Sequence, residues 1–213
     1  MHLRLKARWR RAAVALAPLL LTAGTPRGSF AHPSLVVLIV VDQMRPAYYA
    51  RYGAQFTGGL AALRARGAYF PNALQDHAIT QTAPGHSVLL SGRPPSSTGI
   101  LSNDRGVSDP AAPIIGAPLA TGASPWRFRG STLYDWLLAR DSGARVLSVS
   151  RKDRGAILPV GRGRGSVFWF VDGHFTTSRY YADTLPAWVR QYGERPGLAR
   201  LAGRTWTLLL PPS

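Results

Sequence analysis

The 213 residues include no cysteine, so neither a disulfide nor a cysteine-based zinc site can form. Metal ligands must therefore come from Asp, Glu and His. The sequence has neither a His-x-x-x-His nor an Asp-x-x-x-His spacing, which would place two ligands on one helical face. A complete metal site is not visible in this sequence.

Acidic residues are also few, because 10 Asp and Glu stand against 26 Lys and Arg and leave a formal net charge of +16. Lysine is nearly absent: Lys6 and Lys152 are lysines, and every other basic side chain is Arg. Such a charge attracts phosphates, nucleic acid and anionic membranes without specificity. The basic residues beyond the N-terminus are scattered, which favours a solvated surface over a specific nucleic-acid site.

No apolar run is long enough to span a membrane comfortably. Residues 1–31 have the order of an export signal instead: basic residues, an apolar stretch over 12–23, and small residues at Ser29 and Ala31. We predict a signal peptide over 1–31 and a periplasmic or secreted mature protein. An N-terminal membrane anchor is the alternative. No repeat or long linker divides residues 32–213.

Hydrophobic residues make up 46% of the chain, which is enough for a packed core. Apolar, largely β-branched runs predict strands over 34–41, 68–70, 145–150 and 167–172. Helical patterns cover 48–66 with weak points at Gly53 and Gly58-Gly59, then 82–90, 132–140 and 184–192. This alternation predicts a doubly wound α/β fold, in which helices flank a mostly parallel sheet.

Asp42 stands directly after the strand predicted over 34–41. Open α/β sheets bind ligands at this end of their strands, and a carboxylate there needs a metal ion or an arginine to neutralise it. Alternatively, Asp42 caps the following turn by accepting hydrogen bonds from the backbone near Met44 or Arg45. Position alone does not separate the two roles.

Thr82 precedes an Ala-Pro-Gly helix start, where a threonine ordinarily serves as the N-cap. In the functional alternative, the helix N-terminus stabilises an anion beside the hydroxyl, and a metal ion or base activates that hydroxyl as a nucleophile. No Ser-His-Asp arrangement is evident, so a metal ion is the simpler activator. The nearby His77 and His86 are better explained by packing or capping.

Two further segments are candidates for contact with a phosphate group. Asn103 lies in a loop, where Asn commonly forms turns, although its amide can also donate to a phosphoryl oxygen. Lys152 and Arg154 follow the strand predicted over 145–150 and form a pair that can clamp a phosphate. Lys152 is the only lysine after Lys6, which indicates that this position requires an ammonium group.

Taken in order, these motifs resemble the PafA-like phosphatases of the alkaline phosphatase superfamily, which are related to nucleotide pyrophosphatases and phosphodiesterases. The likeness extends over most of the chain after the signal sequence and includes the loops. The matching segments are Val40 to Arg45, Thr82 to Ser87 with Ser91-Gly92, Gly99 to Asp104, Lys152 to Leu158, and 168–189.

The resemblance implies a site that holds two zinc ions. Asp42 would be a ligand of one zinc ion, and Thr82 would be the nucleophile that bridges toward it and becomes a phospho-threonine. Asn103, Lys152 and Arg154 would bind the non-bridging phosphoryl oxygens. The Lys–Arg pair is associated in this family with monoesters, because a dianionic monoester exposes one more charge than a diester.

The family's remaining zinc ligands, a set of Asp and His residues, lie in the second half of its longer members. Asp42 and Thr82 alone fall short of the three or four ligands that a zinc ion takes. We therefore expect the chain to be the N-terminal part of such a domain, a truncated fragment that needs the C-terminal half. Apolar surface that this half would cover should be exposed.

Three functions stay open at this point. The complete protein would hydrolyse phosphate monoesters, or would act as a phosphodiesterase or nucleotide pyrophosphatase of the same superfamily. The third possibility is a non-catalytic, exported anion-binding remnant.

The 213 residues by themselves should have negligible phosphatase activity, because the remaining metal ligands are not among them. The test is turnover of para-nitrophenyl phosphate with added zinc. Robust turnover would contradict the expectation of an incomplete site.

Overall fold

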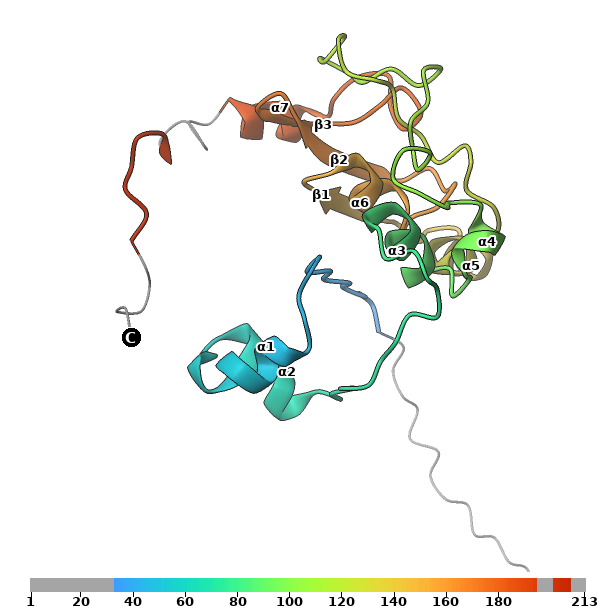
Figure 1. The fold of residues 1–213 in the computed structure, drawn as a ribbon. Coiled ribbons are helices and arrows are strands. Elements are labelled where there is room, and N and C mark those ends of the chain that lie inside the picture. Colours follow the sequence, from blue (N-terminus) through green and yellow to red (C-terminus); the bar gives the residue numbers. More distant parts are fainter. Residues whose placement is uncertain (1–32, 195–200, 208–213) are drawn as a thin grey trace, which may run out of the picture. The chain divides into compact units, whose positions relative to one another are not determined.

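The computed structural model describes residues 33–194 and 201–207 (Figure 1). The predicted signal peptide lies outside these residues. The chain divides into two compact units, Met1–Val41 and Asp42–Ser213. None of the described helices combines the length and the apolar character needed to cross a bilayer.

The apolar segment 34–41 does not form the predicted strand. Leu35, Val37 and Ile39 are 75%, 67% and 75% exposed, and no ladder or bridge within the described residues includes them. A strand is stabilised by hydrogen bonds to a neighbouring strand, which an apolar sequence alone does not supply. The predictions of a buried strand over 34–41 and of a short strand over 68–70 are therefore wrong for this structure.

The helical prediction over 48–66 is confirmed, including its interruption. The chain forms α1 (Ala47–Tyr52), the 3-10 turn η1 (Gly53–Gln55) and α2 (Gly59–Arg66). Rings of Phe56 and Tyr69 lie 5.3 and 5.5 Å from the ring of Tyr49. This aromatic contact joins the helices to the chain that follows them.

A three-stranded sheet forms the centre of the structure, with the order β1 (Leu147–Ser150), β2 (Ser166–Val171) and β3 (His174–Thr176). β1 and β2 are parallel, and α6 (Asp153–Ile157) lies in the connection between them. β2 and β3 are antiparallel and are joined through Asp172 and Gly173, whose φ angles of 47° and 89° suit a tight hairpin turn. The predicted doubly wound parallel sheet is thus reduced to one βαβ unit with an added hairpin strand.

Four further helices follow the order of the chain. They are α3 (Thr82–Leu89), α4 (Pro95–Thr98), α5 (Leu133–Arg140) and α7 (Ala187–Gly193). α6 packs on β1 and β2, α3 packs on α6 and α4, and α7 packs on β3 (Figure 1). The predicted helices over 82–90, 132–140 and 184–192 are confirmed, whereas α4, α6 and β3 were not predicted.

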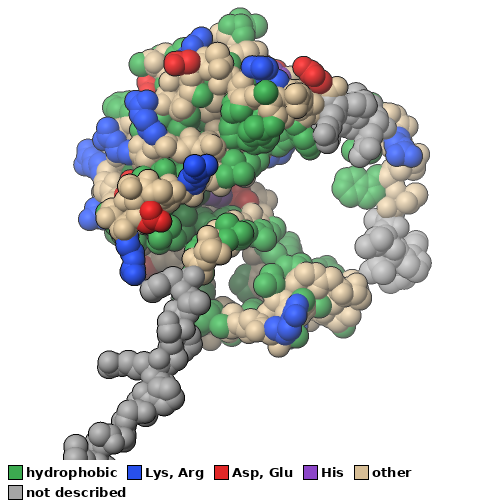
Figure 2. All heavy atoms as spheres, turned by 180° about the vertical axis from the view of Figure 1, so that it is seen from behind, with side chains coloured by type: hydrophobic (Ala, Val, Ile, Leu, Met, Phe, Trp, Pro, Cys, Tyr) green, Lys and Arg blue, Asp and Glu red, His purple; other side chains and the backbone are tan. Residues whose placement is uncertain are grey.

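The core includes side chains from the segment 92–130, which consists largely of loops apart from α4. Ile100 and Phe128 from this segment are fully buried beside Ile157 and Trp169. The loops are therefore part of the packed interior. Arginine and lysine side chains are spread over the face shown in Figure 2 and do not form a single patch, as the sequence predicted.

Thr132 offers a test of this packing, because it is fully buried and its hydroxyl donates to the Val160 carbonyl at 2.9 Å. Thr132→Val keeps the shape but removes this donor and the capping hydroxyl at the start of α5, so it should lower the free energy of unfolding by about 1–2 kcal/mol. The same change at the exposed Thr57 should cost less than about 0.5 kcal/mol. Urea unfolding of both variants measures the difference, and equal losses would contradict the assigned role.

Candidate functional site

Thr82 is the first residue of α3, and Gln81 occupies the N-cap position, so Thr82 is not the N-cap. Pro84 lies in the first turn of α3, where its missing N–H has no cost because the first amides of a helix have no partner within it. The Thr82 hydroxyl therefore does not close the helix end. It donates to Asp42 Oδ2 over 3.4 Å.

Asp42 lies within hydrogen-bonding distance of this hydroxyl although forty positions separate the two residues in the sequence. The next residue, Gln43, has φ of 65°, a left-handed conformation that is uncommon for a side chain of its kind. The hydrogen bond of Asp42 comes from Thr82, and none from the Met44 or Arg45 backbone to Asp42 is found among the described residues.

Asn103 is tied to the same helix end by two hydrogen bonds. Its Oδ1 accepts from the Ala83 N–H at 2.8 Å, and its own N–H donates to Gln81 Oε1 at 2.9 Å. Because the Oδ1 atom has this backbone donor, the Nδ2 group of the amide is left to donate to another acceptor. Gln81 was not identified from the sequence as a residue of this site, although a polar side chain directly before Thr82 could have indicated it.

Lys152 is the N-cap residue of α6, and Arg154 lies in its first turn. The Arg154 Nη1 is 3.4 Å from Asp153 Oδ1, while its Nε is buried without a hydrogen-bond partner in the described structure. A buried guanidinium N–H calls for an acceptor, and a phosphoryl oxygen would supply one. Lys152 itself is exposed.

His86 links the two halves of the candidate site. Its Nδ1 is 2.8 Å from the Thr82 carbonyl oxygen, and because that oxygen only accepts, Nδ1 carries the proton of this bond. Its Nε2 would lie 3.6 Å from a Cβ placed on Gly155. His86 therefore packs between the start of α3 and α6, as the sequence indicated for a packed histidine.

The metal-binding capacity of these residues is partial. Within the described ranges, no group of three or more His, Asp or Glu side chains could hold an ion. The Asp42 and Thr82 oxygens are nevertheless 3.4 Å apart, close to the ~3.3–3.6 Å that separates two oxygens on one tetrahedral zinc ion with bonds of about 2.0–2.2 Å. The pair fits part of a zinc site, and the other ligands would have to come from elsewhere.

The sequence of this chain is similar to a protein family and to several known proteins. The family model described as type I phosphodiesterase / nucleotide pyrophosphatase matches residues 36–195. Alkaline phosphatase PafA of Elizabethkingia meningoseptica is 36% identical over 195 residues, which cover 84% of this chain and 36% of that protein. Alkaline phosphatase PhoV of Synechococcus elongatus is 35% identical over 199 residues, covering 85% of this chain and 36% of that protein.

Solved structures agree with these matches. Wild-type alkaline phosphatase PafA superposes with a TM-score of 0.75 at 35% identity, over 81% of this chain and 36% of that one. A second crystal structure is a PafA variant at TM-score 0.74 and 33% identity, again over 81% of this chain and 36% of that one. One threonine, one asparagine, one lysine and one arginine are replaced in that variant. The chain thus spans about a third of the length of the relatives it matches.

Gly155 tests the contact between α6 and β1. A Cβ at this position would lie 2.5 Å from Ser150 Oγ, so Gly155→Ala should force α6 away and lower the free energy of unfolding by about 1–3 kcal/mol. Gly59→Ala is the matched control, because nothing lies within 4 Å of its added methyl and alanine favours the helix. Chemical denaturation of both should separate them, and equal stability would exclude the tight contact.

Proposed function

Since the chain belongs to the type I phosphodiesterase / nucleotide pyrophosphatase family, we propose that the complete protein hydrolyses phosphate monoesters through Thr82. The resemblance seen in the sequence is confirmed by the alkaline phosphatase relatives. The observation that carries the proposal is the contact between the Thr82 hydroxyl and the Asp42 carboxylate at the start of α3.

In this proposal, Thr82 Oγ attacks the phosphorus atom, the ester P–O bond breaks, and the alcohol leaves. Water then hydrolyses the phospho-threonine and releases phosphate. Zinc ions, held in part by Asp42 and Thr82, would supply the positive charge that ionises the hydroxyl and stabilises the transition state. The N-terminus of α3 also favours the negative charge that gathers beside Thr82.

Asn103, Lys152 and Arg154 complete the proposed phosphate site. The Asn103 amide is oriented by its bond from Ala83 so that Nδ2 can donate to a phosphoryl oxygen. α6 presents the two cations and packs directly on α3. Two fixed cations offset the desolvation of a dianionic monoester more than that of a monoanionic diester, which favours monoester hydrolysis.

The solved PafA variant supports these assignments by residue type and spacing. Its replaced threonine and asparagine are separated by the same 21 positions as Thr82 and Asn103, and its lysine and arginine are two positions apart, as Lys152 and Arg154 are. Phosphodiester or nucleotide pyrophosphate hydrolysis is the second candidate, because the family model carries that description. Export through the predicted signal peptide, to the periplasm or outside the cell, belongs to the same proposal.

The test of the nucleophile uses an enzyme in which this chain continues into a C-terminal part with the remaining zinc ligands. Thr82→Ala should lower kcat by about 10³-fold or more, because the attacking oxygen is lost. Thr82→Ser retains a hydroxyl and should keep measurable turnover. Full activity of the alanine variant would refute the assignment.

A second test in the same enzyme concerns the two cations. Replacing Lys152 and Arg154 together by alanine should reduce kcat/KM for para-nitrophenyl phosphate at least about tenfold more than for its methyl diester. Arg162→Ala removes an exposed cation outside the proposed site and serves as the control. An equal loss for both substrates would favour the diesterase.

A further inference from the structure

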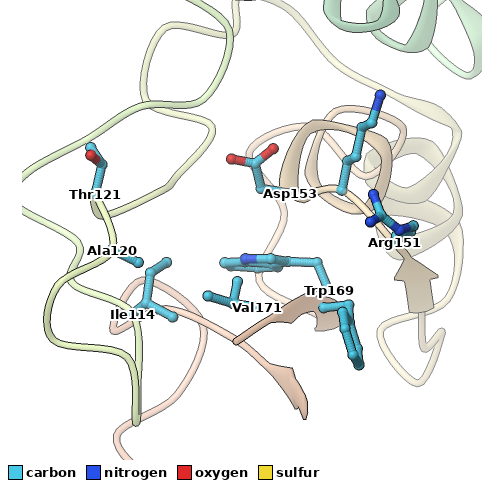
Figure 3. A pocket seen from close by; sticks show the side chains of 9 residues that line it. Ile114, Ala120, Thr121, Arg151, Asp153, Trp169 and Val171 are labelled. Carbon is cyan, nitrogen blue, oxygen red and sulfur yellow. The ribbon is translucent and has the colours of Figure 1, made fainter. Parts of the chain in front are cut away.

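A pocket of about 360 Å³ lies where β1 and β2 end, the edge at which parallel strands offer ligand sites (Figure 3). Its volume falls within the range of small-molecule sites. Three parts of the chain line it: residues 114–121, the start of α6 with the residues before it, and the second half of β2. The lining residues are Ile114, Ala120, Thr121, Arg151, Lys152, Asp153, Trp169, Phe170 and Val171.

The wall formed by residues 114–121 is hydrogen-bonded near its start, through both backbone groups of Ile115. Ile115 N–H donates to the Thr177 carbonyl at 2.9 Å, and Thr176 Oγ1 donates to the Ile115 carbonyl at 2.5 Å. Beyond the wall, a Cβ on Gly122 would lie 2.2 Å from the Asp109 carbonyl oxygen. The start of this wall is therefore fixed by hydrogen bonds, and the chain just beyond its end is closely packed against the backbone.

The floor of the pocket is apolar. Trp169 and Val171, two positions apart on β2, lie side by side at the pocket (Figure 3), with Trp169 1% exposed and Val171 half-buried. The ring of Phe170, between them in the strand, lies 5.4 Å from the ring of Phe175. The Tyr181 ring packs edge-on against Trp169 at 6.4 Å. Burial, assisted by the neighbouring Tyr180, raises the pKa of Tyr181 well above its usual range, so it adds no charge beneath the floor.

The rim carries positive charge on one side. Arg151 and Lys152 are exposed. Asp153, the first residue of α6, also lines the pocket, and its carboxylate accepts from the Arg154 backbone at 2.6 Å and lies 3.4 Å from its guanidinium. Figure 3 shows Ile114, Ala120 and Thr121 across the pocket from Arg151. The pocket thus offers cations at one side and an apolar interior, which suits an anion joined to an apolar group.

We propose that this pocket binds the organic group of the phosphate ester and selects aryl or similarly sized apolar esters over small polar ones. The inference rests on the proposed function, because Lys152 is taken to hold the phosphate while the ester group points into the pocket. Lys152 belongs to both the pocket and the phosphate site, which places the two next to each other.

All nine lining residues lie in this chain, so binding can be measured on the chain itself. The probes are 2-naphthyl phosphate, methyl phosphate and inorganic phosphate, with affinities from calorimetry. The naphthyl ester should bind about tenfold more tightly than methyl phosphate, because a buried ring gains apolar contact. Thr121→Trp, at an exposed lining position, should remove this difference and leave inorganic phosphate within about twofold of its original affinity.

Leu119→Trp is the matched control, since Leu119 is 99% exposed and does not line the pocket. It should leave the naphthyl preference unchanged. The absence of that preference in the unaltered chain, its survival in the Thr121 variant, or an equal loss in the Leu119 variant would each overturn the proposal.

The lack of cysteine allows a second measurement that does not depend on a bulky substitution. Thr121→Cys and Leu119→Cys each introduce the only thiol of the chain. 2-Naphthyl phosphate should slow alkylation of the thiol at position 121 about tenfold at saturation and leave that at position 119 unchanged. Equal protection of both thiols, or of neither, would contradict a site at this pocket.

Inorganic phosphate separates this inference from the proposed function. If Lys152→Ala does not weaken the binding of inorganic phosphate, the proposed phosphate site fails. If Lys152→Ala does weaken it but the naphthyl preference is absent, the pocket proposal alone fails.

Discussion

The packing of the first turn of α3 against α6 is the contact on which the candidate site depends. His86 takes part on the α3 side, where its Nδ1 donates to the Thr82 carbonyl, and its Nε2 would lie at an ordinary contact distance of 3.6 Å from a Cβ placed on Gly155 of α6. The close contact brings the hydroxyl of one helix start near the cations of another. Without it, Thr82 and Arg154 would belong to unrelated surfaces.

At the start of α3, polar side chains accept hydrogen bonds from backbone amides. Asn103 accepts from the Ala83 amide, and Gln81 accepts from the Asn103 amide, so side-chain acceptors partner amides at the helix start and in the adjoining loop. The Thr82 hydroxyl donates to Asp42, and the Asn103 NH₂ group is the donor that the proposed function assigns to a phosphoryl oxygen.

In the proposals made above, the pocket beside Lys152 would receive the organic group of the substrate whose phosphate Lys152 binds. Its wall comes from the 114–121 segment and its floor from β2, and neither is near Thr82 in the sequence. The exposed apolar side chains of residues 35–41, together with Leu147 and Val149 on β1, match the expectation of uncovered apolar surface. Such surface is consistent with a chain that spans about a third of its relatives' length.

The amino-acid sequence by itself determined the helices at 48–66, 82–90 and 132–140, the two parallel strands, the family, and the residues proposed for catalysis. These are local patterns and motif spacings, which periodicity and residue type specify. Tertiary structure decided whether 34–41 formed a strand, because a strand depends on a partner. It also decided the contact between Asp42 and Thr82, the role of His86 and the pocket next to Lys152, because each joins segments that are distant in the chain.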